Sequence, residues 1–266
     1  MNNYSKIALA TLLLGTTLQF ACTQAPKDIK KPENPQVKVS QGQEETGELP
    51  CQDKLISCEA KGYRSLVPYE DQKANAPKID QYYLARFETT EGDIDIEIYP
   101  QAAPNAARRF VTLIDKGFYN DIPIFRVVKH PQPFVAQFGI NWRKGLIDWR
   151  DKNFNDDPCI FKLEPGTLAF AKAGPNTNST QVFINYINTD PLRSQNFTTF
   201  AKVVKGFENT DKFKSVGDPA MGLDQGALWN YGESYLESLP SDQKPTMIKK
   251  AYLIGNDTTP KAEEKK

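Results

Sequence analysis

Few side chains in this sequence are suited to covalent or metal chemistry. The chain has 266 residues, with four cysteines and a single histidine, His130. A single histidine excludes a metal site with several histidine ligands, and any Ser-His-Asp triad would need His130 itself. The sequence contains no Cys-x-x-Cys pair, no Gly-x-Gly-x-x-Gly fingerprint and no Gly-Lys-Ser/Thr phosphate loop. It therefore predicts no metal, nucleotide or redox cofactor.

The charge balance argues against a nucleic-acid-binding protein. Lys and Arg together number 33, Asp and Glu also number 33, and the formal net charge is zero. Nucleic-acid-binding proteins normally show a basic excess or a basic patch. Hydrophobic residues make up 39% of the chain, which suffices for one globular domain accompanied by polar segments.

Residues 1–21 have the composition of a signal peptide for export. Lys6 supplies the positive charge at the start, and a mainly apolar stretch runs from Ile7 to Leu18. Cys22 follows the small residue Ala21, which favours a lipoprotein lipidated at Cys22. Ordinary cleavage and an uncleaved anchor are the alternatives. We therefore expect an exported, periplasmic protein that is anchored to a bacterial membrane by a lipid on Cys22.

The segments on either side of the main domain are polar. Residues 22–49 are rich in Lys, Glu, Gln and Pro, which predicts a disordered tether, and residues 257–266 form a polar tail. Residues 50–78 form an N-terminal extension with Cys51 and Cys58, for which export favours a local disulfide over two free thiols. Cys159 is then left over and is predicted to be a buried structural thiol.

Apolar and polar residues alternate from residue 82 onward, as expected for half-buried β-strands. Residues 85–89 and 94–98 alternate strictly on either side of the Glu91-Gly92 turn, which predicts an antiparallel hairpin. Further short strands are predicted at 123–128, 134–138, 166–171, 181–185, 199–204 and 247–254.

One helix is predicted from Pro104 to Lys116, ending at Gly117. Its apolar residues recur at helical spacing on one face, whereas Arg108 and Arg109 lie mostly off that face and are predicted to be solvated. One early helix followed by many short strands favours an antiparallel barrel over a βαβ fold.

Several blocks between residues 79 and 256 match one family in order. They are Glu91–Pro100, Ala103-Pro104, Lys116–Tyr119, Ile124–Val128, Phe134–Gly139, Gly166–Asn185 and Phe200–Gly206. This region resembles the cyclophilin-type peptidyl-prolyl cis-trans isomerases. The resemblance implies a mainly β fold, a closed eight-stranded antiparallel β-barrel capped by two α-helices, over residues 79–256.

The resemblance also implies a site that isomerises X-Pro bonds. Arg126 matches the cation that acts near the prolyl nitrogen, and Gln137 matches the residue that orients this arginine and the substrate carbonyl. Gln181 matches a groove residue. The remaining matches are the apolar proline pocket, Phe134, Val135, Phe183 and Leu192, and a backbone edge for the residues before proline, Ala171, Lys172 and Ala173. Asn196 or Phe197 stands where many members have a His, and Phe197 is also predicted to bind the substrate.

The predicted function is that of a monomeric isomerase that acts on proline-containing polypeptides as a folding helper in the cell envelope. Phe125, Phe138 and Pro191 stand where the family often has His, Gly and Trp. A non-catalytic, membrane-tethered module that binds proline peptides is therefore the alternative. A structural subunit of an envelope complex is a third hypothesis.

Overall fold

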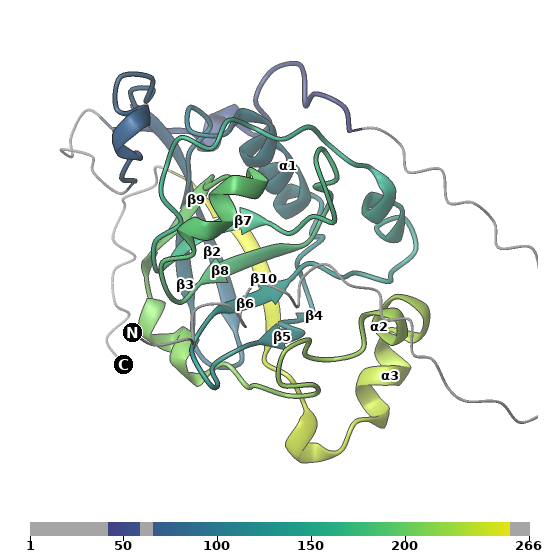
Figure 1. Ribbon diagram of the computed structural model, residues 1–266. Coiled ribbons are helices and arrows are strands. Elements are labelled where there is room, and N and C mark those ends of the chain that lie inside the picture. The colour runs from purple at the N-terminus through teal and green to yellow at the C-terminus, as the bar shows by residue number, and fades with distance from the viewer. Residues whose placement is uncertain (1–41, 59–65, 256–266) are drawn as a thin grey trace, which may run out of the picture. The chain divides into compact units, whose positions relative to one another are not determined.

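The structure is a computed structural model that describes residues 42–58 and 66–255 (Figure 1). The predicted signal peptide, Cys22, most of the predicted tether and the polar tail lie outside the described residues. Within the described ranges, no helix is long and apolar enough to cross a membrane.

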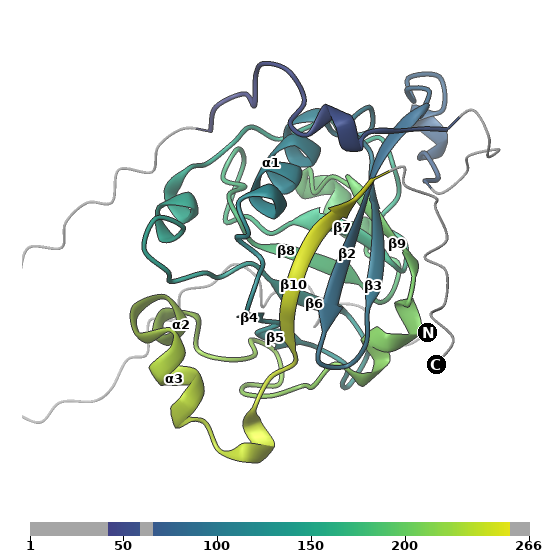
Figure 2. The same ribbon diagram turned by 180° about the vertical axis from the view of Figure 1, so that it is seen from behind.

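The domain is built around one antiparallel sheet. Its strands run in the order β4-β10-β2-β3-β9-β7-β8-β6-β5, with β1 paired to β2, and Figure 2 shows β10, β2 and β3 side by side. The strands are β1 (Ile56–Ser57), β2 (Gln81–Thr89), β3 (Ile94–Ile98), β4 (Ile122–Pro123), β5 (Arg126–Val127), β6 (Val135–Phe138), β7 (Thr167–Phe170), β8 (Val182–Asn185), β9 (Ala201–Lys205) and β10 (Met247–Ile254).

The two outer strands of the sheet, β4 and β5, are consecutive in the sequence. Only Ile124 and Phe125 separate β4 from β5, so the sheet has to curl to bring its outer strands together. The predicted strand 123–128 is divided here because both residues bond outside the ladder: Ile124 N donates to Thr246 O and Phe125 O accepts from Leu223 N. The mainly β, antiparallel prediction is confirmed. The sheet has ten strands rather than eight, and no ladder among the described residues joins β4 to β5.

Helices lie at two ends of the sheet (Figures 1 and 2). The predicted helix is α1 (Pro104–Asp115). In place of a single second helix there are two short ones, α2 (Gln225–Tyr231) and α3 (Glu233–Ser238), beside β4 and β5. Six short 3₁₀ turns complete the described elements: η2 (Gln52–Lys54), η3 (Glu70–Gln72), η4 (Ile147–Asp151), η5 (Asp190–Gln195), η6 (Phe207–Lys212) and η7 (Ser241–Gln243).

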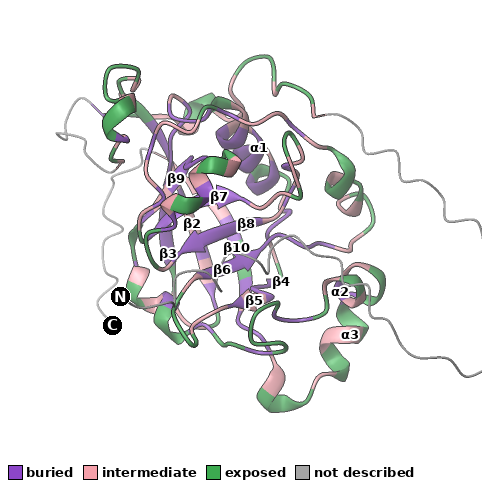
Figure 3. Cartoon of the chain, viewed as in Figure 1, coloured by how far each residue is buried: buried purple, intermediate pink, exposed green. Residues whose placement is uncertain are grey.

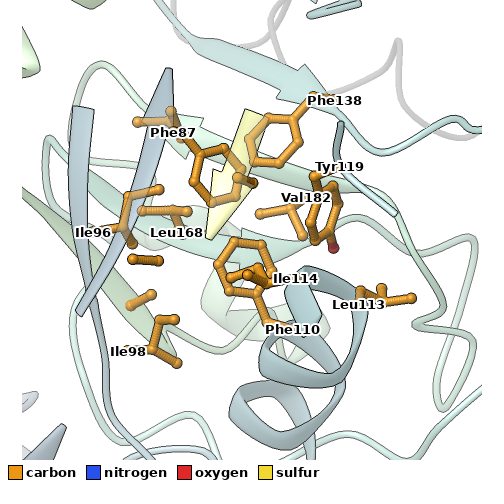
Figure 4. Packing of buried hydrophobic residues seen from close by; sticks show 14 of the residues in the cluster. Phe87, Ile96, Ile98, Phe110, Leu113, Ile114, Tyr119, Phe138, Leu168 and Val182 are labelled. Atoms are coloured by element: carbon orange, nitrogen blue, oxygen red, sulfur yellow. The ribbon is translucent and has the colours of Figure 1, made fainter. Parts of the chain in front are cut away.

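The main hydrophobic core lies between α1 and the sheet (Figure 4). Phe110 of α1 is fully buried and stacks on Phe87 of β2, with ring centroids 5.7 Å apart. The same ring meets Phe200 edge-on at 5.0 Å. Figure 3 shows how burial is concentrated in the strands and α1, whereas α2 and α3 expose much of their surface.

The two faces of β6, β7 and β8 have different roles. Ala136, Phe138, Leu168, Phe170, Val182 and Ile184 point into the main core. The residues that alternate with them, Val135, Ala169 and Phe183, belong to a second apolar cluster on the other face. Because side chains of a strand alternate between faces, the period of two seen in the sequence separates the core from the candidate site.

The domain begins earlier in the chain than predicted. Gln43 pairs with the loop before residue 156: its N–H donates to Asn153 O at 3.2 Å, and its carbonyl accepts from Asn155 N at 3.0 Å. Glu45 forms an ion pair with Arg109, whose side chain is 5% exposed. Residues 42–49 are therefore docked on the domain and are not part of a disordered tether.

Arg109 is buried, contrary to the prediction that it is solvated. Besides Glu45, its guanidinium donates to the carbonyls of Lys152 and Ser179. It also lies 4.9 Å from the ring centre of Phe154. The prediction considered only the apolar face of the helix, whereas the N-terminal segment and the loop around residue 152 cover the opposite face.

The predicted Cys51–Cys58 disulfide is not formed, and both residues are free thiols. Cys51 packs at the edge of the main core, where it interacts with Asp115 of α1. Cys58 is buried in a separate cluster with Tyr82 and Phe161. Cys51 precedes β1 and Cys58 follows it in the chain, and their side chains pack in different hydrophobic clusters.

Candidate active site

Four of the strands place a row of residues on the face opposite the main core. The backbone register pairs Arg126 of β5 with Gln137 of β6, Gln137 with Phe183 of β8, and Phe183 with Ala169 of β7. Paired residues of neighbouring antiparallel strands point to the same face. The predicted cation, the predicted amide and the predicted proline-binding surface therefore lie side by side, although they come from separate parts of the chain.

Arg126 is held on two sides by neutral acceptors. Its Nη1 donates to Gln137 Oε1 at 3.0 Å, and its Nε donates to Ala220 O at 2.6 Å. Its guanidinium carbon lies 5.8 Å from the ring centre of Phe134. Burial lowers the pKa of Arg126 from its ordinary value, but an arginine remains protonated at neutral pH. The salt bridges found in the described part of the chain do not include Arg126.

The turn that supplies Ala220 has a defined shape. Asp218 Oδ1 accepts from the N–H groups of Ala220 at 2.9 Å and Met221 at 2.8 Å. Gly222 follows with φ +73°, and a Cβ there would lie 2.1 Å from Phe125 O. Only glycine allows this close approach without strain. The turn therefore packs directly against the start of β5 and directs a carbonyl at the Arg126 side chain.

The residues predicted to bind proline share one apolar cluster. Val135, Phe183, Leu192 and Phe197 are buried in it, and Phe134 packs against it while remaining partly exposed. The rings of Phe183 and Phe197 meet edge-on at 5.8 Å. Leu192 comes from η5, and Phe197 follows that turn. The structure thus brings all five predicted residues together beside Arg126.

The predicted edge for the residues before proline follows β7, but its lysine has another use. Lys172 Nζ forms an ion pair with Asp156 at 2.7 Å, and the Lys172 side chain is 2% exposed. The same Nζ donates to Asn196 O at 3.0 Å. The backbone N–H of Ala171 donates to Gln181 O and that of Ala173 to Thr177 Oγ1. A peptide on this edge would therefore bind the backbone groups of residues 171–173 that these bonds do not use, and not the Lys172 ammonium.

Gln181, predicted to line the groove, lies beside Gln137 and connects the site to α2. Gln137 Nε2 donates to Gln181 Oε1 at 2.8 Å, and Gln181 Nε2 donates to Gln225 Oε1 at 3.3 Å. Sequence reasoning missed both Ala220 and Gln225. The only local signal is Asp224, a favourable residue for starting a helix, which accepts from Ala227 N at 2.9 Å and so fixes the first turn of α2.

The described residues offer no group suited to a metal. They contain no cluster of three or more His, Cys, Asp and Glu side chains placed to hold an ion.

Cys159 lies beside the apolar cluster and donates to Phe197 O at 2.9 Å. Burial raises the pKa of its thiol to about 11, so Cys159 is a neutral thiol near the site and not a nucleophile.

The family of the chain follows from a direct match. The family model for cyclophilin type peptidyl-prolyl cis-trans isomerase/CLD matches residues 84–224, which include the strands that carry the row of site residues. The chain belongs to this family.

Two curated relatives of this cyclophilin-type chain are longer proteins, and one solved structure is similar in fold. Peptidyl-prolyl cis-trans isomerase-like 2 of Gibberella zeae is 33% identical over 166 residues, which cover 60% of this chain and 28% of the relative. Peptidyl-prolyl cis-trans isomerase 9 of Schizosaccharomyces pombe is 32% identical over 144 residues, which cover 49% of this chain and 23% of the relative. A cyclophilin type isomerase of Cryptosporidium parvum matches in structure with a TM-score of 0.46 and 22% identity, covering 66% of this chain and 99% of that one. The chain spans about a quarter of the length of the two curated relatives.

Two of the departures from the cyclophilin pattern are absorbed by packing. Phe125 is fully buried in a cluster with Ile140 and Leu223, away from the proline-binding residues. Phe138 points into the main core, where its ring lies 5.7 Å from that of Phe87. Neither phenylalanine shares the face of Arg126, so neither blocks the row of site residues. Pro191 lies exposed at the start of η5.

Proposed function

We propose that this chain is a peptidyl-prolyl cis-trans isomerase that accelerates rotation about X-Pro bonds. The observation that carries the proposal is the position of Arg126: a partly desolvated guanidinium, fixed by Gln137 and Ala220, stands next to an apolar cluster. Family membership supports the proposal.

The chemistry of the reaction fits such a site. Resonance gives the peptide C–N bond partial double-bond character, so rotation meets a barrier of about 18–20 kcal/mol. In the twisted state the prolyl nitrogen loses this conjugation and regains its lone pair, to which a fixed cationic donor can bind. Stabilising the twisted state by about 5–8 kcal/mol would accelerate rotation roughly 10⁴–10⁶-fold without a nucleophile or cofactor.

The residues assign a place to each part of the substrate. The proline ring would pack on Phe134, Phe183 and their neighbours in the apolar cluster. The residues before proline would lie along the backbone of 171–173, as in the family pattern. Gln137 would act as the residue that orients Arg126. Its Oε1 accepts from Arg126 and its Nε2 donates to Gln181, so both ends of its amide are held beside the arginine.

The cellular setting belongs to the same proposal. Residues 1–21 and Cys22 support an exported protein anchored by lipid at the bacterial cell envelope, where a monomeric isomerase would act on proline-containing polypeptides as they fold. Labelling with a fatty-acid analogue, lost on Cys22→Ala, tests the anchor separately from the activity.

Exchange between the cis and trans forms of a short X-Pro peptide, followed by NMR with the full chain, tests the activity. We expect acceleration by the wild type, and a loss of about 100-fold or more in Arg126→Ala because the fixed donor is removed. Arg150→Ala, which removes a partly exposed arginine, is the matched control and should stay close to wild type. A folded wild type that binds the peptide without accelerating exchange would instead identify a proline-peptide-binding module.

A further inference from the structure

A chain of hydrogen bonds leads from Arg126 to α2. It passes from Arg126 Nη1 to Gln137 Oε1, from Gln137 Nε2 to Gln181 Oε1, and from Gln181 Nε2 to Gln225 Oε1, with separations of 3.0, 2.8 and 3.3 Å. Arg126 lies in β5, Gln137 lies in β6, and Gln181 directly precedes β8. The fourth is the first residue of α2.

The direction of every bond in this chain is fixed by its first member. A guanidinium has only donors, so Gln137 has to present its oxygen to Arg126 and its amide nitrogen to Gln181. Gln181 then has to accept with its oxygen and donate with its nitrogen, which requires an acceptor at the far end. Gln225 Oε1 is that acceptor. Without it, Gln181 loses one of the two bonds that hold its amide plane.

Gln225 is placed by the segment just beyond the family match. The match ends at residue 224, and α2 begins at residue 225 with Asp224 as its N-cap. Asp224 N also donates to Tyr235 Oη at 3.2 Å, which connects the start of α2 to α3. Leu228 of α2 is fully buried against Phe125 and its neighbours, directly before β5. The helix therefore holds Gln225 in place relative to the strand that carries Arg126.

We propose that Gln225 is a positioning residue of the isomerase site, which fixes the amide of Gln181 and, through Gln137, the guanidinium of Arg126. The inference rests on the proposed function, since positioning has a meaning here only if Arg126 acts on the prolyl bond. It assigns a role to α2 that the family match does not include.

Two substitutions at this position separate positioning from structural support. Gln225→Met has similar length and no acceptor, whereas Gln225→Glu keeps an acceptor at the same place. We expect kcat in peptide exchange to fall about fivefold in Gln225→Met, the equivalent of one neutral hydrogen bond, with KM little changed. Gln225→Glu should keep at least half of the activity. Asn230→Ala on the exposed side of α2 is the matched control and should equal wild type.

The side-chain amide signals of Gln137 and Gln181 in a ¹H–¹⁵N spectrum give a readout independent of turnover. They should move in Gln225→Met and stay near their wild-type positions in Gln225→Glu. Unchanged signals in Gln225→Met, or an equal loss of activity in both variants, would overturn the inference. A wild type without activity would instead overturn the proposed function, and the spectra would still decide whether Gln225 orders the two amides.

Discussion

The two segments that flank the row of site residues are held by different chemistry. On the β7 side, a buried ion pair joins Lys172 to Asp156, whose side chains are 2% and 9% exposed, and Asn178 Nδ2 donates to the second Asp156 oxygen at 2.7 Å. On the β5 side, neutral groups hold the arginine: the Ala220 carbonyl and the amides of Gln137, Gln181 and Gln225. We name these the charged side and the neutral side.

The difference has a physical reason in the proposed mechanism. A carboxylate next to Arg126 would satisfy the guanidinium, but it would also cancel the positive potential that stabilises the twisted prolyl bond. Neutral acceptors fix the same guanidinium and leave its charge uncompensated. The charged side needs only to fix the backbone edge and Phe197, so a lysine and an aspartate that neutralise each other are suitable there. Substitutions should therefore reduce stability on the charged side and activity on the neutral side.

The largest expected effect is the loss of Lys172. In Lys172→Met, Asp156 is left buried without its cation, which should lower the free energy of unfolding by about 3–5 kcal/mol, measured by urea denaturation at pH 7. Lys249→Met, an exposed lysine of β10, is the matched control and should change it by less than about 0.5 kcal/mol. Adding Asp156→Leu to Lys172→Met should restore much of the loss. A cost below about 1 kcal/mol for Lys172→Met would remove the distinction between the two sides.

The charged side should also respond to pH through Asp157, the neighbour of Asp156. Its carboxylate accepts from Asn105 N at 3.1 Å and Ala106 N at 2.8 Å at the start of α1, and burial raises its pKa from 3.8 to about 6. The folded state then binds this proton more tightly than the unfolded state. The resulting stabilisation is fully present below pH 3.8 and is lost as the pH rises through 6.

A comparison of Asp157→Asn with the wild type isolates this contribution. Between about pH 3.5 and pH 7, the free energy of unfolding of the wild type should fall by up to about 3 kcal/mol relative to the variant, whose amide does not titrate. Urea denaturation at a series of pH values measures this difference. Parallel pH profiles for the two proteins would show that Asp157 keeps an ordinary pKa in the folded state.

The smallest expected change in stability comes from the neutral side. Gln137→Met removes one acceptor from Arg126 and one donor to Gln181, which should lower the free energy of unfolding by only about 1–2 kcal/mol. Peptide exchange should slow about tenfold or more, because a bond to a charged group is worth about 1.5–3 kcal/mol. If Gln137→Met lowered the free energy of unfolding as much as Lys172→Met while peptide exchange stayed fast, the neutral side would serve stability and not activity, contrary to the comparison.

The parts of the site that could be predicted from the sequence are those on regular strands. Alternation along β6 places Val135 and Gln137 on one face, and the register with β8 adds Phe183 to it. The helical spacing of α1 similarly predicts a buried face with Phe110 at its centre. Local periodicity therefore carries the fold class, and the family resemblance gives the register that aligns Arg126 with Gln137.

The parts that could not be predicted depend on partners distant in the chain. Lys172 meets Asp156, which lies 16 positions earlier in the chain, and Arg126 meets Ala220, which lies 94 positions later. The burial of Arg109 depends on Glu45, 64 residues away, in a segment whose polar composition predicts disorder. No local pattern specifies such contacts, because the partners lie on loops and turns that are far apart in the sequence.

The docking of residues 42–49 decides where this chain can be shortened. Composition alone would suggest a first residue near position 50, just before Cys51. Such a cut would remove Glu45 and leave Arg109 buried with its positive charge unpaired. It would also remove Gly42, which packs where a Cβ would lie 2.5 Å from Asn176 O, and Gln43, which bonds to the loop at 153–155. A soluble form for crystallisation or display should therefore start ahead of residue 42.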